Sequence, residues 1–283
     1  MSIGRWFGLG PQTTVLSSAR DGGEIDATTL TRPRVKRNRQ ELAEVAQQFV
    51  TEHLVQSVAP PQAPMMWRAV TRFFELYDQR PIKEDRKGSG FHNLFWLYLT
   101  THFLRPSLIV ESGVRKGVAT WMLRASAPDA TIHGFDITLE RLQYRDPSIH
   151  FHENDWAEEP LEPQDPRSSL CFFDDHVNQA MRIREAYERG FRLLVFDDCM
   201  PAQHITDVGL PPTPTVAMLM DGSLKPGHRF EWDWFGTQRR YEFRAQDTFD
   251  AKSLVSHWAT YPHVGEVHGS RSRSFLTYVR LVA

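Results

Sequence analysis

The sequence has little cysteine, no long hydrophobic run and no excess of basic residues. Only Cys171 and Cys199 occur among 283 residues, which is too few for a disulfide framework or a zinc cluster. The most apolar long stretch, Phe91–Leu104, is too short and too polar to span a membrane and predicts a buried helix. With 33 basic and 35 acidic residues, the chain lacks the strongly basic surface of a general nucleic-acid binder.

The first residues also lack a sustained hydrophobic region before a cleavage site. A secretory signal is therefore not indicated, and we expect a cytoplasmic protein with no membrane partner. A hydrophobic content of 41% is ample for a packed core, so a soluble globular fold is expected. The sequence does not determine the oligomeric state, and a homo-oligomer is one of the alternatives.

The most informative segment that is present runs from Leu108 to Asp136. It reads as an apolar strand, a glycine turn, a helix and a second strand that ends in an acid. Gly113 and Gly117 suit a tight turn with close ligand approach, and the following helix offers free backbone N–H groups. This order of elements predicts a nucleoside-binding site, with a purely structural turn as the alternative.

The acids of this segment favour a ligand without phosphates. Glu111 stands where a dinucleotide fingerprint would carry its first glycine, so a pyrophosphate cradle is less well supported. S-adenosylmethionine (SAM) fits better, because a carboxylate at Glu111 can orient its ammonium group and Asp136 can accept both ribose hydroxyls. Glu111, Ser112, Gly113, Gly117 and Asp136 are the predicted cofactor residues of this segment.

A third strand, Ile149–His152, leads to Asp155 and Trp156. An acid after this strand can face an adenine amino group, and the adjacent aromatic ring can stack on the base, so both residues are predicted to bind the cofactor. The alternative is a helix N-cap aspartate followed by a half-buried tryptophan.

Two later strands, near residues 168–173 and 192–196, also end in acids. A helix over residues 179–189, capped by Gly190, lies between them. Strands alternating with helices predict an α/β fold with a mostly parallel sheet and helices on both faces. In such sheets ligands bind at the carboxyl ends of the strands, where Glu111, Asp136, Asp174 and Asp197 all fall.

Asp174, Asp197 and Asp198 are predicted to hold a divalent metal. Three carboxylates gathered at one edge repel each other unless a cation is present, and oxygen-only ligation suits Mg²⁺. His176 is a predicted catalytic base beside Asp174, because a metal would lower the pKa of an acceptor hydroxyl. Alternatively, some of these acids cap helices or pair with Arg182, Arg184 or Arg189.

The remaining chain divides by composition. Residues 1–37 predict an irregular leader, residues 38–105 a helical extension, and residues 106–283 the α/β domain, with an insertion at about 200–260. We also expect a short helix over Leu139–Tyr144 and two antiparallel edge strands, near Val264–Val267 and Phe275–Leu281. The aromatic and basic segment 230–240 is either an acceptor lid or an ordinary packed insertion.

The stretch from about Leu108 to Pro201 resembles class I SAM-dependent methyltransferases, most closely those of the macrocin O-methyltransferase type. The segment Val110–Gly117 is similar to their first motif, and the acids after the fourth and fifth strands match their Asp-Gly-Asp and paired-Asp segments. The resemblance implies a Rossmann-like methyltransferase fold with a seven-stranded sheet, and metal ligands at Asp174, Asp197 and Asp198. The resemblance places His176 at the position where the family has an aspartate that acts as a base. At this position the chain departs from the family pattern. The same stretch also resembles cephalosporin hydroxylase-like proteins.

These observations favour a SAM-dependent, metal-assisted O-methyltransferase that acts on a hydroxyl of a sugar or glycosylated small molecule. Asp174 and His176 are its expected catalytic residues. A second hypothesis is an iron-dependent oxygenase-like enzyme with Asp174, His176 and Asp197 as ligands, although only His204 offers a second histidine nearby. A third is a binding or assembly protein that keeps the nucleoside-binding fold without catalysis.

Overall fold

The computed structural model describes residues 31–55, 60–83, 88–202, 204, 211–222, 227–234, 237–244, 249–265 and 275–283. The first half contains α1 (Thr31–Phe49), the π-helix η1 (Val50–Leu54), α2 (Ala63–Gln79), α3 (Phe91–Leu104), β1 (Leu108–Ser112), α4 (Val118–Ser126), β2 (Thr131–Phe135) and β3 (Ile149–His152). The second half contains the short helices η2 (Trp156–Glu158) and η3 (Pro166–Ser168), then β4 (Ser169–Phe173), α5 (Gln179–Glu188), β5 (Leu193–Phe196), α6 (Val216–Met220), β6 (Arg229–Trp234), β7 (Thr237–Glu242), α7 (Phe249–Leu254), β8 (Val255–Thr260) and β9 (Thr277–Leu281).

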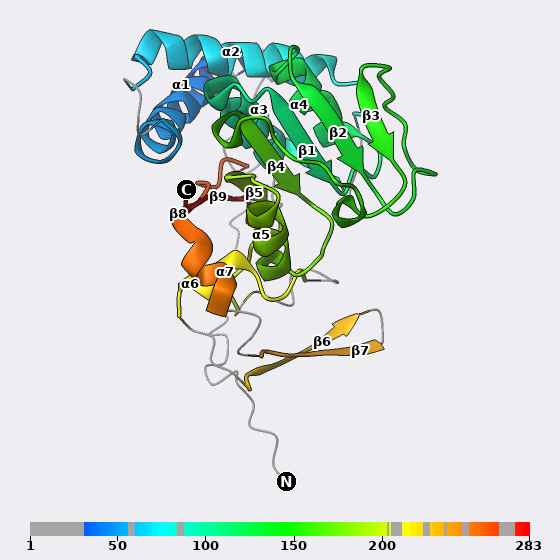
Figure 1. The fold of residues 1–283 in the computed structure, drawn as a ribbon. Coiled ribbons are helices and arrows are strands. Elements are labelled where there is room, and N and C mark those ends of the chain that lie inside the picture. Colours follow the sequence, from blue (N-terminus) through cyan, green and yellow to red (C-terminus); the bar gives the residue numbers. More distant parts are fainter. Residues whose placement is uncertain are drawn as a thin grey trace.

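Seven of these strands form one sheet, in the order β3-β2-β1-β4-β5-β9-β8 (Figure 1). The first five run parallel, whereas β9 is antiparallel to both β5 and β8. The strand order reverses between β1 and β4, and a crevice at such a reversal is the usual ligand site of an open α/β sheet. The chain thus has the predicted Rossmann-like methyltransferase fold, with a mostly parallel, seven-stranded sheet.

Each central strand is buried on both faces because its residues alternate between two cores. In β4, Leu170 and Phe172 join the core formed with α1 to α4, while Cys171 and Phe173 join the core formed with α5 to α7. This explains why the strands are continuous apolar runs instead of alternating polar and apolar residues. The helices cover both faces, as Figure 1 shows for α3 and α4 on one side and α5 on the other.

Helix α3 is the most buried helix of the first core. All its residues from Phe91 to Thr101 are buried, as expected for a helix that is apolar around its whole circumference. It ends at Arg105 in the left-handed conformation, and Pro106 then prevents its continuation. Its first turn therefore points at the carboxyl edge of the sheet from a rigid, buried element.

Three local predictions differ from the structure over the residues that it describes. Residues 139–144 form no helix, because the backbone N–H groups of Gln143 and Tyr144 both donate to the Lys116 carbonyl and dock this segment on the glycine turn. The edge strand beside β9 is β8 at 255–260. Of the strand expected near Val264–Val267, residues 264 and 265 are not in a strand, and the buried Val264 donates its N–H to His92 of α3, while residues 266 and 267 lie outside the described residues. Helix α1 begins at Thr31, inside the leader expected over residues 1–37, but residues 1–30 lie outside the described residues and the leader stays a prediction.

Strands β6 and β7 pair with each other as a separate antiparallel two-stranded sheet. They contain the aromatic and basic segment for which a lid was considered, and that role stays a prediction. Among the described residues, no helix combines the length and apolar character needed to cross a membrane.

Candidate functional site at the carboxyl edge of the sheet

The turn after β1 has the tight geometry that its glycines predict. Gly113 and Gly117 have φ values of 97° and 87°, in the left-handed region that favours glycine. A Cβ at Gly113 would lie 2.2 Å from the Asp174 carbonyl oxygen, and one at Gly117 would lie 3.0 Å from the Tyr144 Cβ. Both glycines are therefore required by the packing of this turn on neighbouring segments, and Gly113 packs directly against the end of β4.

Asp136, at the end of β2, holds the same turn from the other side. Its Oδ2 accepts a hydrogen bond from the Arg115 backbone N–H at 2.7 Å, and its Oδ1 accepts one from the Thr138 N–H at 3.2 Å. Arg115 itself has a positive φ of 52°. The acid predicted to bind ribose thus lies beside the glycine turn and stabilises its strained residue.

Glu111 is fully buried in β1, immediately before the turn. Burial raises the pKa of its carboxyl to about 8, nearby Thr120 offsets part of this effect, and Asp136 raises the pKa further. The contact with Thr120 falls short of a regular hydrogen bond, so neither carboxyl oxygen has a full partner among the described residues. A buried polar group of this kind is costly and is a candidate for ligand binding.

The other three predicted cofactor residues have structural partners. The Ser112 hydroxyl donates to Asp175 at 2.6 Å. Asp155 caps the short helix η2, as its side chain accepts a hydrogen bond from the Ala157 N–H, and it also pairs with Arg182 at 2.7 Å. Trp156 has no exposed surface and belongs to the second core. Asp155 thus caps a helix, as in the alternative, whereas Trp156 is fully buried instead of half-buried.

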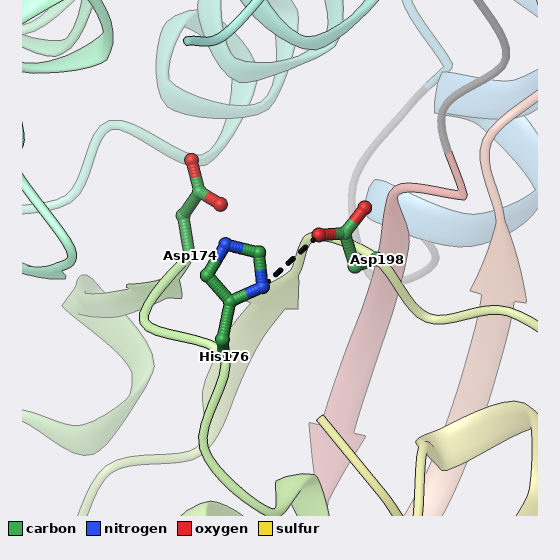
Figure 2. Close-up of side chains that lie close together, drawn as sticks. All are labelled: Asp174, His176 and Asp198. Atoms are coloured by element: carbon green, nitrogen blue, oxygen red, sulfur yellow. Dashed lines mark ion pairs between the residues drawn. The ribbon is translucent and has the colours of Figure 1, made fainter. Parts of the chain in front are cut away.

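At the ends of β4 and β5, Asp174, His176 and Asp198 converge (Figure 2). One potential ligand atom from each residue lies within 4.8 Å of the other two, and His176 Nδ1 is 3.3 Å from Asp198 Oδ2. In Figure 2 the imidazole ring lies between the two carboxylates. His176 and Asp198 have positive φ values of 57° and 51°, a strained conformation that is concentrated at functional sites.

Asp197 was predicted as a metal ligand but is not part of this cluster. Its Oδ2 accepts a hydrogen bond from the Asn93 side chain of α3 at 2.5 Å, and its Oδ1 accepts one from the Asp198 backbone N–H at 2.8 Å. The two neighbouring acids after β5 therefore have different environments. Asp197 connects β5 to α3, whereas Asp198 lies beside His176.

Carboxyl groups are crowded at this edge. Burial raises the pKa of Asp174 well above its ordinary value, and the charges of Asp197, Asp198 and Glu111 raise it further. Burial also raises the pKa of Asp198 to about 8, again with a contribution from Asp197. Neighbouring carboxylates repel each other when all are ionised, and a bound cation would offset this repulsion. The site is therefore suited to binding a cation.

Asp174 connects two adjoining hollows of the surface. One is lined by the glycine turn, including Gly113 and Arg115, and the other by the cluster with His176 and Asp198. Asp174 lines both. A ligand held at the glycine turn and a second ligand held at the cluster would therefore meet at this residue.

Sequence reasoning missed the residues that support the site. Arg182 has a side-chain exposure of 1% and donates to Asp155, Asp175 and Glu185, so it joins the loops after β3 and β4 to α5. It was considered only as a partner of the predicted metal ligands. No local sequence pattern pointed to Asn93, because its partner Asp197 lies 104 positions away in the sequence. His204, the expected second histidine of an iron site, is not part of the cluster.

No family model matches the chain, and a comparison with curated proteins gave no match either. The chain is similar to solved structures of CmcI. With the SAH-bound form it shares 23% identity and a TM-score of 0.36, over 41% of this chain and 64% of that chain. With the form solved with Mg and SAM it shares 20% identity and a TM-score of 0.35, over 46% of this chain and 67% of that chain.

A third similar structure is an SAH-bound methyltransferase from Podospora anserina, with 14% identity and a TM-score of 0.42. That match covers 93% of this chain and 100% of the other. The chain thus spans about two thirds of the CmcI chains and the whole of the Podospora chain. These three structures were solved with SAH or SAM. The fold of this chain is established by the strand order of its own sheet.

Proposed function

We propose that the chain is a SAM-dependent O-methyltransferase, assisted by a divalent metal ion, that methylates a hydroxyl of a sugar or glycosylated small molecule. The observation that carries the proposal is the position of Asp174 between the glycine turn and the cluster, where it lines a small hollow on each side. A methyl donor at the glycine turn and an acceptor at the cluster would be adjacent there. Holding the two reactants together in this way is a large part of the catalysis of a transfer reaction.

The residues at the turn suit the donor. Glu111 offers a buried carboxyl without a full partner, and Asp136 lies at the end of β2, where a ribose can be bound. When bound, SAM supplies the methyl group: its sulfur–methyl bond breaks as the acceptor oxygen–methyl bond forms, leaving SAH and the hydroxyl proton. Ser112 and Asp155 would contribute indirectly by fixing the surrounding loops.

The residues at the cluster suit a hydroxylated acceptor. Carboxylates bind divalent ions, and an ion at this edge could also bind acceptor oxygens and lower the pKa of the hydroxyl that reacts. The side chain of His176 is 44% exposed, so the cluster is accessible from outside. A sugar offers several hydroxyls for such a site. Asp174 and His176, the expected catalytic residues, line the same hollow as Asp198.

The first test is calorimetric titration with SAH and SAM, which examines the donor site alone. We expect binding in the micromolar range and a loss of at least about tenfold in Asp136→Asn, which removes one acceptor oxygen. Asp129→Asn, a matched change at an exposed position before β2, should bind as the unmodified protein does. If the folded protein binds neither compound, the proposal is wrong and a binding or assembly role is favoured.

The second test concerns the acceptor. With SAM bound, a panel of sugars and glycosides is screened for release of SAH, with and without a chelator. The proposal expects SAH release that depends on a hydroxylated acceptor and decreases when the metal is removed. Release that is unaffected by the chelator would contradict the metal-assisted part of the proposal.

A further inference from the structure

The cluster at the ends of β4 and β5 differs in composition from the all-oxygen site that the sequence predicts. Its members are two carboxylates and one imidazole, Asp174, Asp198 and His176. The expected third carboxylate, Asp197, already accepts hydrogen bonds from Asn93 and from the Asp198 N–H. A nitrogen donor thus takes the place of an oxygen donor in the group of side chains that face each other.

The separation of these donors fits a metal ion. Ligand atoms about 2.1 Å from one ion lie roughly 3.0–3.4 Å apart in octahedral or tetrahedral coordination. His176 Nδ1 and Asp198 Oδ2 are 3.3 Å apart, and one potential ligand atom of Asp174 lies within 4.8 Å of both residues. Small adjustments of the Asp174 side chain would therefore complete a three-residue site with open positions for other ligands.

The backbone also supports these positions. His176 and Asp198 both adopt the left-handed conformation, and their side chains point toward each other (Figure 2). Their surroundings are fixed, because Asp175 accepts hydrogen bonds from Ser112 and Arg182 and Asp197 is held by Asn93. Metal-binding side chains that are held by neighbours in this way bind their ion more tightly than mobile ones.

We propose that Asp174, His176 and Asp198 form a binding site for a borderline transition-metal ion of the Fe²⁺ to Zn²⁺ series, and that His176 is a ligand of this ion. Imidazole is a good ligand for such ions, whereas Mg²⁺ prefers oxygen donors and retains its water ligands. His176 then acts on an acceptor hydroxyl through the ion instead of taking its proton. The inference rests on the proposed function for its biochemical role, but metal binding can be measured without SAM.

The test is titration of chelator-treated protein with Co²⁺, followed by its visible absorption, and with Mg²⁺, followed by calorimetry. Every such site prefers Co²⁺ to Mg²⁺ to some extent, so the informative quantity is the change in preference between variants. His176→Asp, which restores an all-oxygen site, is expected to lose about tenfold or more in Co²⁺ affinity and to bind Mg²⁺ at least as well as before.

Two acids adjacent in the sequence give a matched pair of variants. Asp198→Asn should abolish Co²⁺ binding, whereas Asp197→Asn should keep the Co²⁺ affinity within about threefold, because Asp197 is not a ligand. Circular dichroism verifies that each variant is folded. The proposal is overturned if His176→Asp binds Co²⁺ like the unmodified protein, or if Asp197→Asn loses binding as completely as Asp198→Asn. Failure of SAH binding alone would affect only the methyltransferase proposal.

Discussion

At the scale of single residues, the buried carboxyl of Glu111 makes the stability of the fold depend on pH. A carboxyl with an ordinary pKa of 4.5 is buried in a central strand, where its pKa rises to about 8. Between these two values the folded chain keeps a proton that the unfolded chain has lost. Stability therefore decreases as the pH rises through this window, and the penalty is complete above about pH 8.

Glu111→Gln should remove this dependence, because the amide carries no proton that titrates. The unmodified protein is expected to lose stability relative to the variant by up to about 1.4 kcal/mol for each pH unit between the two pKa values. Thermal unfolding of both proteins across this pH range measures the difference. Glu140→Gln, at an exposed position, is the control and should follow the unmodified protein. A constant difference between Glu111→Gln and the unmodified protein would contradict the raised pKa.

At the scale of elements, Arg182 of α5 connects segments that do not pair in the sheet. Its guanidinium donates to Asp155 after β3, to Asp175 after β4 and to Glu185 on its own helix, at 2.7 to 2.9 Å. Because Asp175 also accepts from Ser112 of β1, the loops that surround the proposed donor site share one buried charge network.

Arg182→Met keeps much of the side-chain volume but leaves these carboxylates without their partner. The expected loss is about 3–5 kcal/mol in the free energy of unfolding, as is typical when one member of a buried ion pair is removed. Urea unfolding followed by circular dichroism measures this loss. Arg184→Met on the same helix is the control and should change stability by no more than about 0.5 kcal/mol. Similar losses in both variants would show that the buried network has no special role.

At the scale of the whole molecule, the N-terminal helices and the sheet share one hydrophobic core. Phe73 of α2 has no exposed surface and contacts the rings of Phe91, Phe95 and Tyr98 in α3. The same cluster extends through α3 and α4 to strand residues such as Ile109. The helical extension is therefore continuous with the core of the α/β domain and also provides Asn93, which donates a hydrogen bond to Asp197 beside the cluster of Asp174, His176 and Asp198.

Phe73→Ala is accordingly expected to destabilise the sheet as well as α2. The cost should be roughly 3–5 kcal/mol, the usual range for a buried phenylalanine. Amide hydrogen exchange should show faster opening in both α2 and β1. Met65→Ala, at a position that is 44% exposed on the same helix, should have little effect. Faster exchange confined to α2 would indicate that the helices unfold independently of the sheet.

The sequence by itself determined the alternation of strands and helices and the edge at which the acids gather. Those features depend on local patterns: apolar runs long enough for buried strands, glycines at a turn that requires positive φ, and acids directly after strands. The positions of Glu111, Asp136, Asp174 and Asp197 at the carboxyl edge followed from this order alone, because parallel strands all end at the same side of their sheet.

Only the tertiary structure decided which way each of these side chains faces. Asp197 and Asp198 are neighbours in the chain, yet one is bound by Asn93 and the other faces His176. Trp156 is enclosed in the core, where a local pattern also allowed a ligand contact. These outcomes depend on contacts between residues far apart in the sequence, and such contacts form only when the helices and loops pack around the sheet.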